Sequence, residues 1–369
     1  MSSSSYDTIV IGAGIAGTAA AYYLNKLGQK VLVIDKSGIA SGGSGAAGAF
    51  VSPKIGVNSP LKDLTDDAFA FAYSFYSDHF PDHYHATGIV RIPKTATDAA
   101  KIPYYSQFHK TKNEILDPKQ LSKLHINSIY EGTLFNEAGA CDTVPLCKAL
   151  LEGIDFKLLE AKNIDFADGK WHVEGFDAKN LVLATGFEND LFDVKYMGIK
   201  GTWGNRADFG SSLPLEITLH ESLSISANMG GVIKLGATHE LEVKEPKPCD
   251  ESKAMELKNN ASRLIDTSDF KLIKTYCGMR SGSRDFAPVV GKVIDVANML
   301  NYPNILNGRK YPIKYIDNLF ILNGLGARGF VLGPYLANEL ASYMVNGAEI
   351  DSRVNPDRLF WNWIRKIKY

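Results

Sequence analysis

The glycines of this chain are the first residues whose spacing could do chemistry. The pattern GxGxxG occurs three times, as GAGIAG (12–17), GSGAAG (43–48) and GLGARG (324–329). Where such a turn joins a strand to a helix, bare backbone can approach a pyrophosphate and the helix N-terminus faces its negative charge. In a chain with 33 glycines the pattern alone is weak evidence, so the flanking residues must decide what each copy does.

The first copy has every part of a dinucleotide-binding unit. Residues 6–11 (YDTIVI) predict a buried parallel strand, residues 16–28 a helix, and residues 30–35 (KVLVID) a second strand. The three glycines would allow a tight turn, close approach of a pyrophosphate, and packing of helix on strand, while the acid that ends the second strand would accept from ribose hydroxyls. The predicted cofactor-binding residues of this unit are Gly12, Gly14, Ile15, Ala16, Gly17, Asp35 and Lys36.

The second copy follows no strand and is itself the loop after the second strand, so it does not begin another nucleotide fold. A run of small residues is useful where backbone must lie close to a flat ligand or its phosphates. The alternative is a flexible surface loop. The candidate cofactor contacts here are Ser41, Gly42, Ser44, Gly45 and Gly48.

The third copy follows a strand (318–323) and opens a helix (331–344), but no second strand ending in an acid comes after it. A glycine turn at a helix N-terminus is electropositive and Arg328 adds a full charge, so we expect an anion there. A further strand, NLVLATG (180–186), is of the kind that closes the dinucleotide sheet of flavoproteins. Together these features favour FAD over NAD, and the added candidate contacts are Ala161, Ala184, Thr185, Gly186, Gly326, Ala327, Arg328, Gly329 and Phe330.

Two other stretches predict a second domain. Residues 59–137 contain an expected helix at 61–80, a strand at 88–93 and a short helix at 117–125. Residues 196–277 alternate as strands do, with segments 214–227 and 230–240 predicted to form an antiparallel hairpin joined at 228–231, followed by a helix at 251–265. The expected fold is α/β. It combines a Rossmann-type FAD-binding domain (1–58, 138–195, 278–369) with a mainly antiparallel-sheet substrate domain (59–137, 196–277) whose sheet covers one face of the cofactor.

Composition limits the partners only weakly. A net charge of -1 gives no general attraction to polyanions, so nucleic acid would need a local basic patch. The basic tail (Arg358, Arg365, Lys366, Lys368) is interpreted as a solvated helix face, with an RNA patch as the alternative. The aromatic residues of 70–84 have helical spacing and are expected in a core, with base stacking as the minority interpretation.

Cysteines and histidines do not predict a metal site. Cys141, Cys147, Cys249 and Cys277 are spaced like neither a metal site nor a disulfide framework, so we expect buried or inert thiols in a reducing compartment. His79, His83 and His85 lack carboxylate or cysteine partners at ligand spacing. The start of the chain lacks a signal-peptide pattern, and glycines break the uncharged run at 8–25, so the expected location is cytoplasmic, without membrane contact.

Set in order, these motifs resemble the FAD-dependent amine oxidases of the D-amino acid oxidase and glycine oxidase superfamily, most closely the oxidase domain of the MnmC family of tRNA-modifying enzymes. The resemblance spans nearly the whole chain and includes LFNEAGACDTVPLC, LGATHE, GMRSGSRDFAPVVG, LGARGFVLGP and VNPDRLFWNWIRK. The Gly-x-Arg-Gly turn at 326–329 and the Arg-x-x-x-Arg-Asp run at 280–285 favour MnmC over glycine oxidases. One departure is Ala46, where the family's small-residue loop usually has asparagine, and the methyltransferase part of MnmC has no counterpart in these residues.

The resemblance implies a reaction. The MnmC oxidase domain removes the carboxymethyl group from 5-carboxymethylaminomethyluridine in tRNA, leaving 5-aminomethyluridine and glyoxylate. Arg280 matches the superfamily arginine that binds the substrate carboxylate, with an ion pair to Asp285 as the alternative, and Arg328 would support the reduced flavin or bind substrate. The implied partners are tRNA and a separate methyltransferase. The alternatives are a small-molecule glycine- or sarcosine-type oxidase and a catalytically silent flavin-binding RNA-interaction protein.

Overall fold

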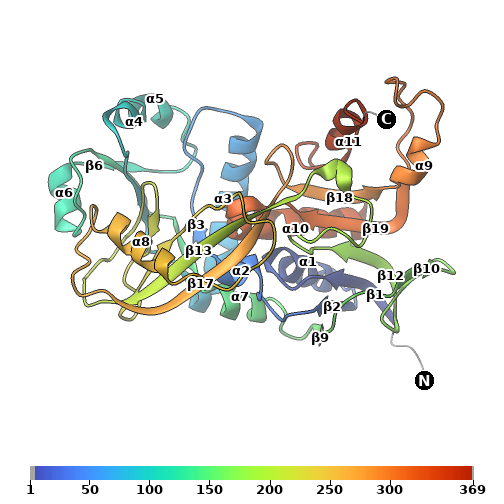
Figure 1. The fold of residues 1–369 in the computed structure, drawn as a ribbon, viewed down its shortest axis with the longest axis horizontal. Helices are drawn as coiled ribbons and strands as arrows, with labels where there is room; N and C mark the ends of the chain where they lie inside the picture. Colours follow the sequence, from blue (N-terminus) through green and yellow to red (C-terminus); the bar gives the residue numbers. More distant parts are fainter. Residues whose placement is uncertain (1–4, 368–369) are drawn as a thin grey trace.

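The computed structural model describes residues 5–367, and within them two large sheets lie next to each other along the long axis of the molecule (Figure 1). Each large sheet has eight strands among the described residues, and a small third sheet has three. The prediction of an α/β fold with a Rossmann-type sheet and a second, mainly antiparallel sheet is confirmed.

The first sheet is built on a parallel core in the spatial order β19–β12–β1–β2–β9. Its antiparallel additions are the hairpin β10–β11 beside β12 and the strand β18 beside β19. The bounds are β1 Ser5–Ile11, β2 Val31–Asp35, β9 Asp155–Leu158, β10 Ile164–Ala167, β11 Lys170–Val173, β12 Phe176–Leu183, β18 Val289–Ile294 and β19 Tyr315–Asn323. The strands expected at 6–11, 30–35, 180–186 and 318–323 are therefore present.

Alternation along these strands gives the first sheet two apolar faces. Val10 and Val33 lie in one core with α1 (Ile15–Lys26), α3 (Pro60–His79), α7 (Thr143–Ala149) and α10 (Gly329–Asn346). Ile9 and Ile34 lie in a second core with η2 (Lys195–Met197), α9 (Val296–Leu300) and α11 (Asp357–Ile364). Burial on both faces explains why the strands are continuously apolar, as parallel strands covered by helices are.

The second sheet has the order β17–β13–β16–β15–β14–β5–β7–β6. Its bounds are β5 Ile89–Arg91, β6 Glu114–Leu116, β7 Gly132–Phe135, β13 Lys200–Gly210, β14 Thr218–His220, β15 Ser224–Ile225, β16 Val232–Gly236 and β17 Lys271–Gly282. One face is apolar, with Phe209, Leu235 and Leu219 packed in a core with α8 (Ser252–Ala261). The long strands β13 and β17 run from the outer part of this sheet toward the first sheet (Figure 1).

The remaining elements are short. They are α2 (Gly43–Ala46), β3 (Phe50–Val51), η1 (Pro81–His83), β4 (Tyr84–His85), α4 (Ala96–Ala99), α5 (Ile102–Ser106), α6 (Pro118–Lys123), β8 (Gly139–Cys141) and η3 (Gly326–Arg328). The small sheet is β3–β8–β4.

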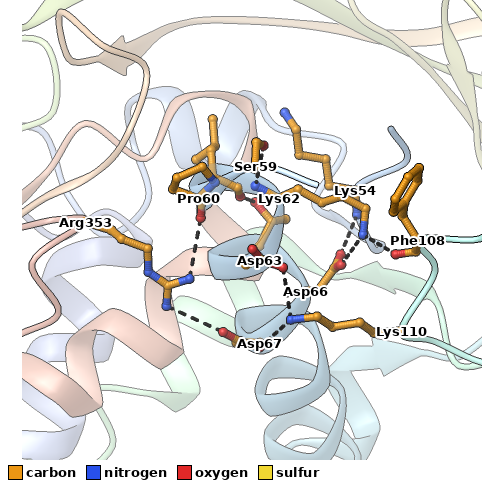
Figure 2. A network of polar contacts seen from close by, with 12 residues as sticks. Lys54, Ser59, Pro60, Lys62, Asp63, Asp66, Asp67, Phe108, Lys110 and Arg353 are labelled. Atoms are coloured by element: carbon orange, nitrogen blue, oxygen red, sulfur yellow. Dashed lines mark hydrogen bonds and ion pairs between the residues drawn. The ribbon is translucent and has the colours of Figure 1, made fainter. Parts of the chain in front are cut away.

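Polar contacts join two segments of the chain to α3, the segment at Phe108 and the segment after α10 (Figure 2). Lys62 pairs with Asp66, each almost fully buried, and its Nζ also donates to the Phe108 carbonyl at 2.7 Å. Arg353, after α10, reaches Asp67 at 3.5 Å. A buried charge without a partner would be costly, and Lys62 and Asp66 neutralise each other. Because Lys62 also donates to the Phe108 carbonyl, it holds the segment at Phe108 against α3.

Residues 214–227 do not form the single strand that we expected. They fold as two short strands, β14 and β15, that pair with each other, and the turn between them is held by Glu221, whose carboxylate accepts from the Ser222 N–H at 3.1 Å. The second half of the predicted hairpin is correct, because β15 pairs with β16 antiparallel across the 228–231 turn.

The expectation of four free thiols is wrong for two of them. Cys249 and Cys277 form a disulfide across 28 residues of sequence, because the segment before α8 returns to the edge strand β17. Cys141 and Cys147 are free and buried, as expected. The aromatic face of 70–84 does form core, with Phe75 and Tyr76 buried.

The predicted division into two domains stays a prediction, with β17 crossing the boundary between 277 and 278. Among residues 5–367, no helix combines the length and apolar character that a membrane span requires.

Candidate active site

The first glycine turn is packed so tightly that side chains would not fit. Gly12 has φ +107°, and a Cβ on it would lie 2.3 Å from the Ala184 carbonyl oxygen. A Cβ on Gly17 would lie 1.8 Å from the Gly12 carbonyl oxygen. The turn therefore joins β1, α1 and the end of β12 through bare backbone, as a pyrophosphate-binding turn requires.

The α1 N-terminus presents donors with no competing charge. Its first turn has no acidic residue and Gly14 provides no side-chain cap. The Ile15 N–H donates to Ser44 Oγ at 2.9 Å, which brings the second glycine segment to the same helix end. Ile15 and Ala16 open the helix, so their backbone is what a phosphate would meet there.

Asp35 is held by backbone donors. Its carboxylate accepts from the N–H groups of Ala13 at 2.8 Å, Ser37 at 2.8 Å and Gly38 at 2.9 Å. A carboxylate has about four acceptor sites, so one remains for a ribose hydroxyl. Lys36 instead pairs with Glu188 at 2.7 Å, which raises the pKa of Lys36.

The second glycine segment packs against the second sheet. A Cβ on Gly43 would lie 2.4 Å from the Met279 carbonyl oxygen, and a Cβ on Gly278 would lie 2.9 Å from Ala46 Cβ. Gly45 and Gly48 are also crowded, against the Ala40 carbonyl oxygen and the Phe50 ring, whereas nothing lies within 4 Å of a Cβ on Gly42. Small residues here let α2 lie directly on β17, and Ser41 stays exposed beside them.

Asn323 links three of the predicted segments. Its Nδ2 donates to the Gly186 carbonyl at 2.8 Å, and its Oδ1 accepts from the Gly324 N–H at 2.7 Å and from Ser281 Oγ at 3.0 Å. Asn323 is 2% exposed, so these bonds satisfy a buried amide. Three segments therefore meet at the Asn323 side chain: the Ala-Thr-Gly residues after β12, the third glycine turn, and the strand that carries Arg280.

The other candidates in these segments lie close by. Thr185 Oγ1 donates to the Glu188 carbonyl, and Ala161 is buried after β9. Gly326 and Ala327 are exposed at the start of η3, and Gly326 has φ +59°. A Cβ on Gly329 would lie 3.0 Å from Ile15, so this glycine lets α10 pack on α1. Phe330 is buried, and its carbonyl accepts from the Tyr76 hydroxyl at 2.8 Å.

The second sheet presents its polar face toward these segments. The register Arg206↔Gly236↔Ser224↔His220↔Arg91 places three basic side chains in one cross-strand row, and Arg280 lies on the same face of β17. Arg206 donates to the Ala47 carbonyl, and the His220 ring meets the Phe50 ring at 5.0 Å. The cationic face of this sheet thus lies against the loop that follows the Rossmann unit.

Arg280 is fixed by backbone and a histidine rather than by an acid. Its Nη1 donates to the Thr238 carbonyl at 3.2 Å and lies 3.4 Å from His239 Nδ1. Burial lowers the pKa of Arg280, while burial and then the Arg280 charge lower the pKa of His239, which keeps that ring neutral. The alternative ion pair with Asp285 is not formed, because Asp285 binds Arg358 at 2.9 Å. Arg280 therefore keeps donors for an incoming acid group.

Arg328 does not lie free at the glycine turn. Its Nη1 donates to the Ser52 carbonyl at 3.1 Å, and burial followed by the Arg91 charge lowers the pKa of Arg328 to about 10. Burial and the Arg328 charge likewise lower the pKa of Lys54. His220 is 5% exposed, and its Nδ1 is buried without a partner within residues 5–367. Burial, and then the charges of Arg91 and Arg328, keep the pKa of His220 well below its usual value. The partly buried Lys54, Arg91 and Arg328, beside the buried and neutral His220, form a region of positive potential.

These features fit a flavin dinucleotide. The glycine turn and the α1 N-terminus suit the pyrophosphate, Asp35 suits a ribose, and the cationic sheet face suits an anionic ring or substrate. A model of the family described as FAD dependent oxidoreductase matches residues 7–343. The chain belongs to this family.

The curated proteins that are similar to this chain carry the name MnmC. The bifunctional protein MnmC for tRNA 5-methylaminomethyl-2-thiouridine biosynthesis from Legionella pneumophila is 24% identical over 92% of this chain and 54% of its own length. The same-named protein of Maricaulis maris is 26% identical, over 92% and 52%. The chain thus spans about half the length of the curated relatives it matches.

Solved structures show the same fold. Glycine oxidase from Bacillus cereus has a TM-score of 0.78 at 19% identity, covering 93% of this chain and 96% of its own. Iminodiacetate oxidase from Chelativorans sp. BNC1 has a TM-score of 0.77 at 19% identity, covering 95% and 98%.

Sequence reasoning missed three residues of the site: Gly204, His239 and Asn323. Asn323 could have been suspected, since it stands between a predicted strand and a glycine turn. Gly204 and His239 gave no such signal, because they reach Arg280 only through strand pairing and a loop return.

Proposed function

We propose that this chain is an FAD-dependent oxidase that removes the carboxymethyl group from 5-carboxymethylaminomethyluridine at the tRNA wobble position, releasing glyoxylate. The observation that carries the proposal is Arg280, a mostly buried guanidinium that is held by Thr238 and His239 and has no carboxylate partner among residues 5–367. A carboxylate on a secondary amine is the anion that this fork would take.

FAD would be held by the first glycine turn, the α1 N-terminus, Asp35 and the α2 segment. The chemistry that FAD supplies when bound is acceptance of a hydride from the carbon between the amine and the carboxylate. Arg280 would orient that carbon by pinning the adjacent carboxylate, and the neutral His239 ring would support Arg280 without adding a competing positive charge. The resulting imine would be hydrolysed by water, giving the free amine and glyoxylate. A separate methyltransferase would be the partner that acts on the amine.

The third glycine turn would support negative charge. Its helix N-terminus and the cluster of Lys54, Arg91 and Arg328 would stabilise an anionic ring or a second acid group of the substrate. Because Arg328 lowers the pKa of Lys54 and Arg91 lowers that of Arg328, an anion bound there would relieve the repulsion between them.

The test is anaerobic flavin bleaching by the purified yellow protein. We expect tRNA carrying carboxymethylaminomethyluridine to bleach the flavin much faster than glycine or sarcosine does. Arg280→Ala should slow bleaching by roughly 100-fold or more, since a lost buried charge pair costs about 2–5 kcal/mol. Bleaching by tRNA no faster than by free glycine would remove the tRNA substrate from the proposal.

A second candidate is oxidation of a small N-substituted glycine. This candidate is favoured by the length of the match, because this chain aligns with 96% of the glycine oxidase chain and 98% of the iminodiacetate oxidase chain. Iminodiacetate carries the same N–CH2–carboxylate unit plus a second carboxylate, which the Arg91 and Arg328 charges would suit. Rapid bleaching by iminodiacetate with none by tRNA would select this candidate.

A further inference from the structure

Phe286 is an exposed aromatic residue in a conformation that its type disfavours. It lies in the turn between β17 and β18 with φ +65° and a side chain 81% exposed. Left-handed backbone is costly for a bulky residue, and an exposed ring adds nothing to a core. Folding alone would be served better here by glycine or asparagine, so the ring calls for an explanation outside folding.

The turn is held in this shape by contacts that do not involve the ring. Arg358 donates to both Asp285 carboxylate oxygens at 2.9 and 3.0 Å, and to the carbonyls of Ala287 at 2.9 Å and Pro288 at 2.8 Å. Ser283 Oγ lies 2.9 Å from Asp285 Oδ1. Arg358 is thus part of this turn rather than of a solvated helix face, which corrects that expectation for this residue. The outcome is a rigid turn that presents Phe286 to solvent.

Positive charge surrounds the turn. Arg284 is exposed, and its N–H donates to the Met197 carbonyl at 3.1 Å, next to the exposed Lys195 of η2. Exposed Lys200 pairs in register with Gly282. The nearby acids are Asp285, neutralised by Arg358, and exposed Asp193.

The turn is also close to the candidate site along the chain. Phe286 follows Arg280 by six residues and lies four residues after the end of β17, and Gly282 bridges to Leu325 at the third glycine turn. A nucleoside oxidised at Arg280 would have to be drawn out of its RNA stack, which leaves neighbouring bases unstacked.

We infer that Phe286 stacks on an unpaired base of the RNA substrate. The basic residues Arg284, Lys195 and Lys200 would hold the adjoining phosphates. Stacking on an exposed aromatic ring beside basic residues is how proteins grip single-stranded RNA. This inference rests on the proposed tRNA substrate and adds the surface that recognises it.

The test compares Phe286→Ala and Phe286→Tyr with the wild type in the flavin-loaded full chain. We expect Phe286→Ala to raise the KM for modified tRNA and the Kd for a fluorescent anticodon stem-loop about tenfold, with Phe286→Tyr near wild type. The KM for sarcosine should not change. Tyr104→Ala, which removes a 52% exposed ring from α5, is the matched control and should alter none of these values.

The role of the basic residues in holding phosphates is tested separately. Arg284→Ala should weaken stem-loop binding and reduce the slope of log Kd against log salt by about 0.7. Equal stem-loop affinity for wild type and Phe286→Ala would overturn the inference, and so would a wild type that does not bind the stem-loop. A wild type that binds the stem-loop through Phe286 but fails to oxidise tRNA would overturn the proposed reaction alone.

Discussion

The guanidinium of Arg280 lies directly over Gly204 of the neighbouring strand. A Cβ placed on Gly204 would be 2.4 Å from Arg280 Nη2 and 2.5 Å from Nη1. Gly204 pairs in register with Gly278, where the missing side chain makes room for Ala46, so the absence of a side chain at Gly204 is what opens room for the charged group.

Gly204→Ala should therefore displace the Arg280 guanidinium while leaving the strand in place. We expect kcat/KM for a carboxylate substrate to fall roughly 10- to 100-fold, because misplacement of about 1 Å at a positioning group has such effects. The flavin absorbance should be unchanged. Gly210→Ala on the same strand, where a Cβ would make ordinary contacts with Ile273 at 3.6 Å and the Lys271 carbonyl oxygen at 3.8 Å, is the control and should keep full activity.

Gly43 and Gly42 make a matched pair for the second glycine segment. Gly43→Ala should separate α2 from β17, since its Cβ would lie 2.4 Å from the Met279 carbonyl oxygen. Gly42→Ala meets nothing within 4 Å. We expect the first variant to purify with much less flavin and the second with a wild-type content, measured by absorbance near the flavin band. Equal flavin content in the two would contradict the role of this contact.

The Cys249–Cys277 disulfide should stabilise the second sheet, because Cys277 lies in its edge strand β17. It closes a loop of 28 residues that includes α8, for which loop entropy gives about 3–4 kcal/mol. The Cys249→Ser/Cys277→Ser double variant should lose about that much in free energy of unfolding. A reducing agent should destabilise the wild type similarly and the double variant not at all. If reduction leaves the melting temperature of the wild type unchanged, the expectation fails.

Glu339 in α10 should make stability depend on pH. Burial, and then the Asp351 charge, raise the pKa of Glu339 to about 7. A carboxyl group that holds its proton more tightly when folded costs stability as pH rises from the unfolded value toward the folded one, here from about 4.5 to 7. We expect Glu339→Gln to be more stable than the wild type at pH 8, by about 1 kcal/mol after allowing for partial exposure, and to lose that advantage by pH 4.5. Thermal melts at both pH values measure this, with exposed Glu349→Gln as the control.

The sequence by itself determined the Rossmann unit and the placing of the glycine turns. Strand alternation, helix periodicity and the φ demands of glycine act over a few residues, so they can be read along the chain. The strand and turn at Asn323 were visible for the same reason, whereas the Arg-x-x-x-Arg-Asp run was identified only by its resemblance to the MnmC family.

Only the tertiary structure decided which distant residues meet. The register of β13 against β17 puts Gly204 under Arg280, and the return of the loop before α8 brings Cys249 to Cys277. Asp285 finds Arg358, 73 residues away, rather than Arg280. Such contacts depend on strand register and on packing between elements, since a shift of one residue would turn each side chain to the opposite face of its sheet. Local pattern does not carry that information.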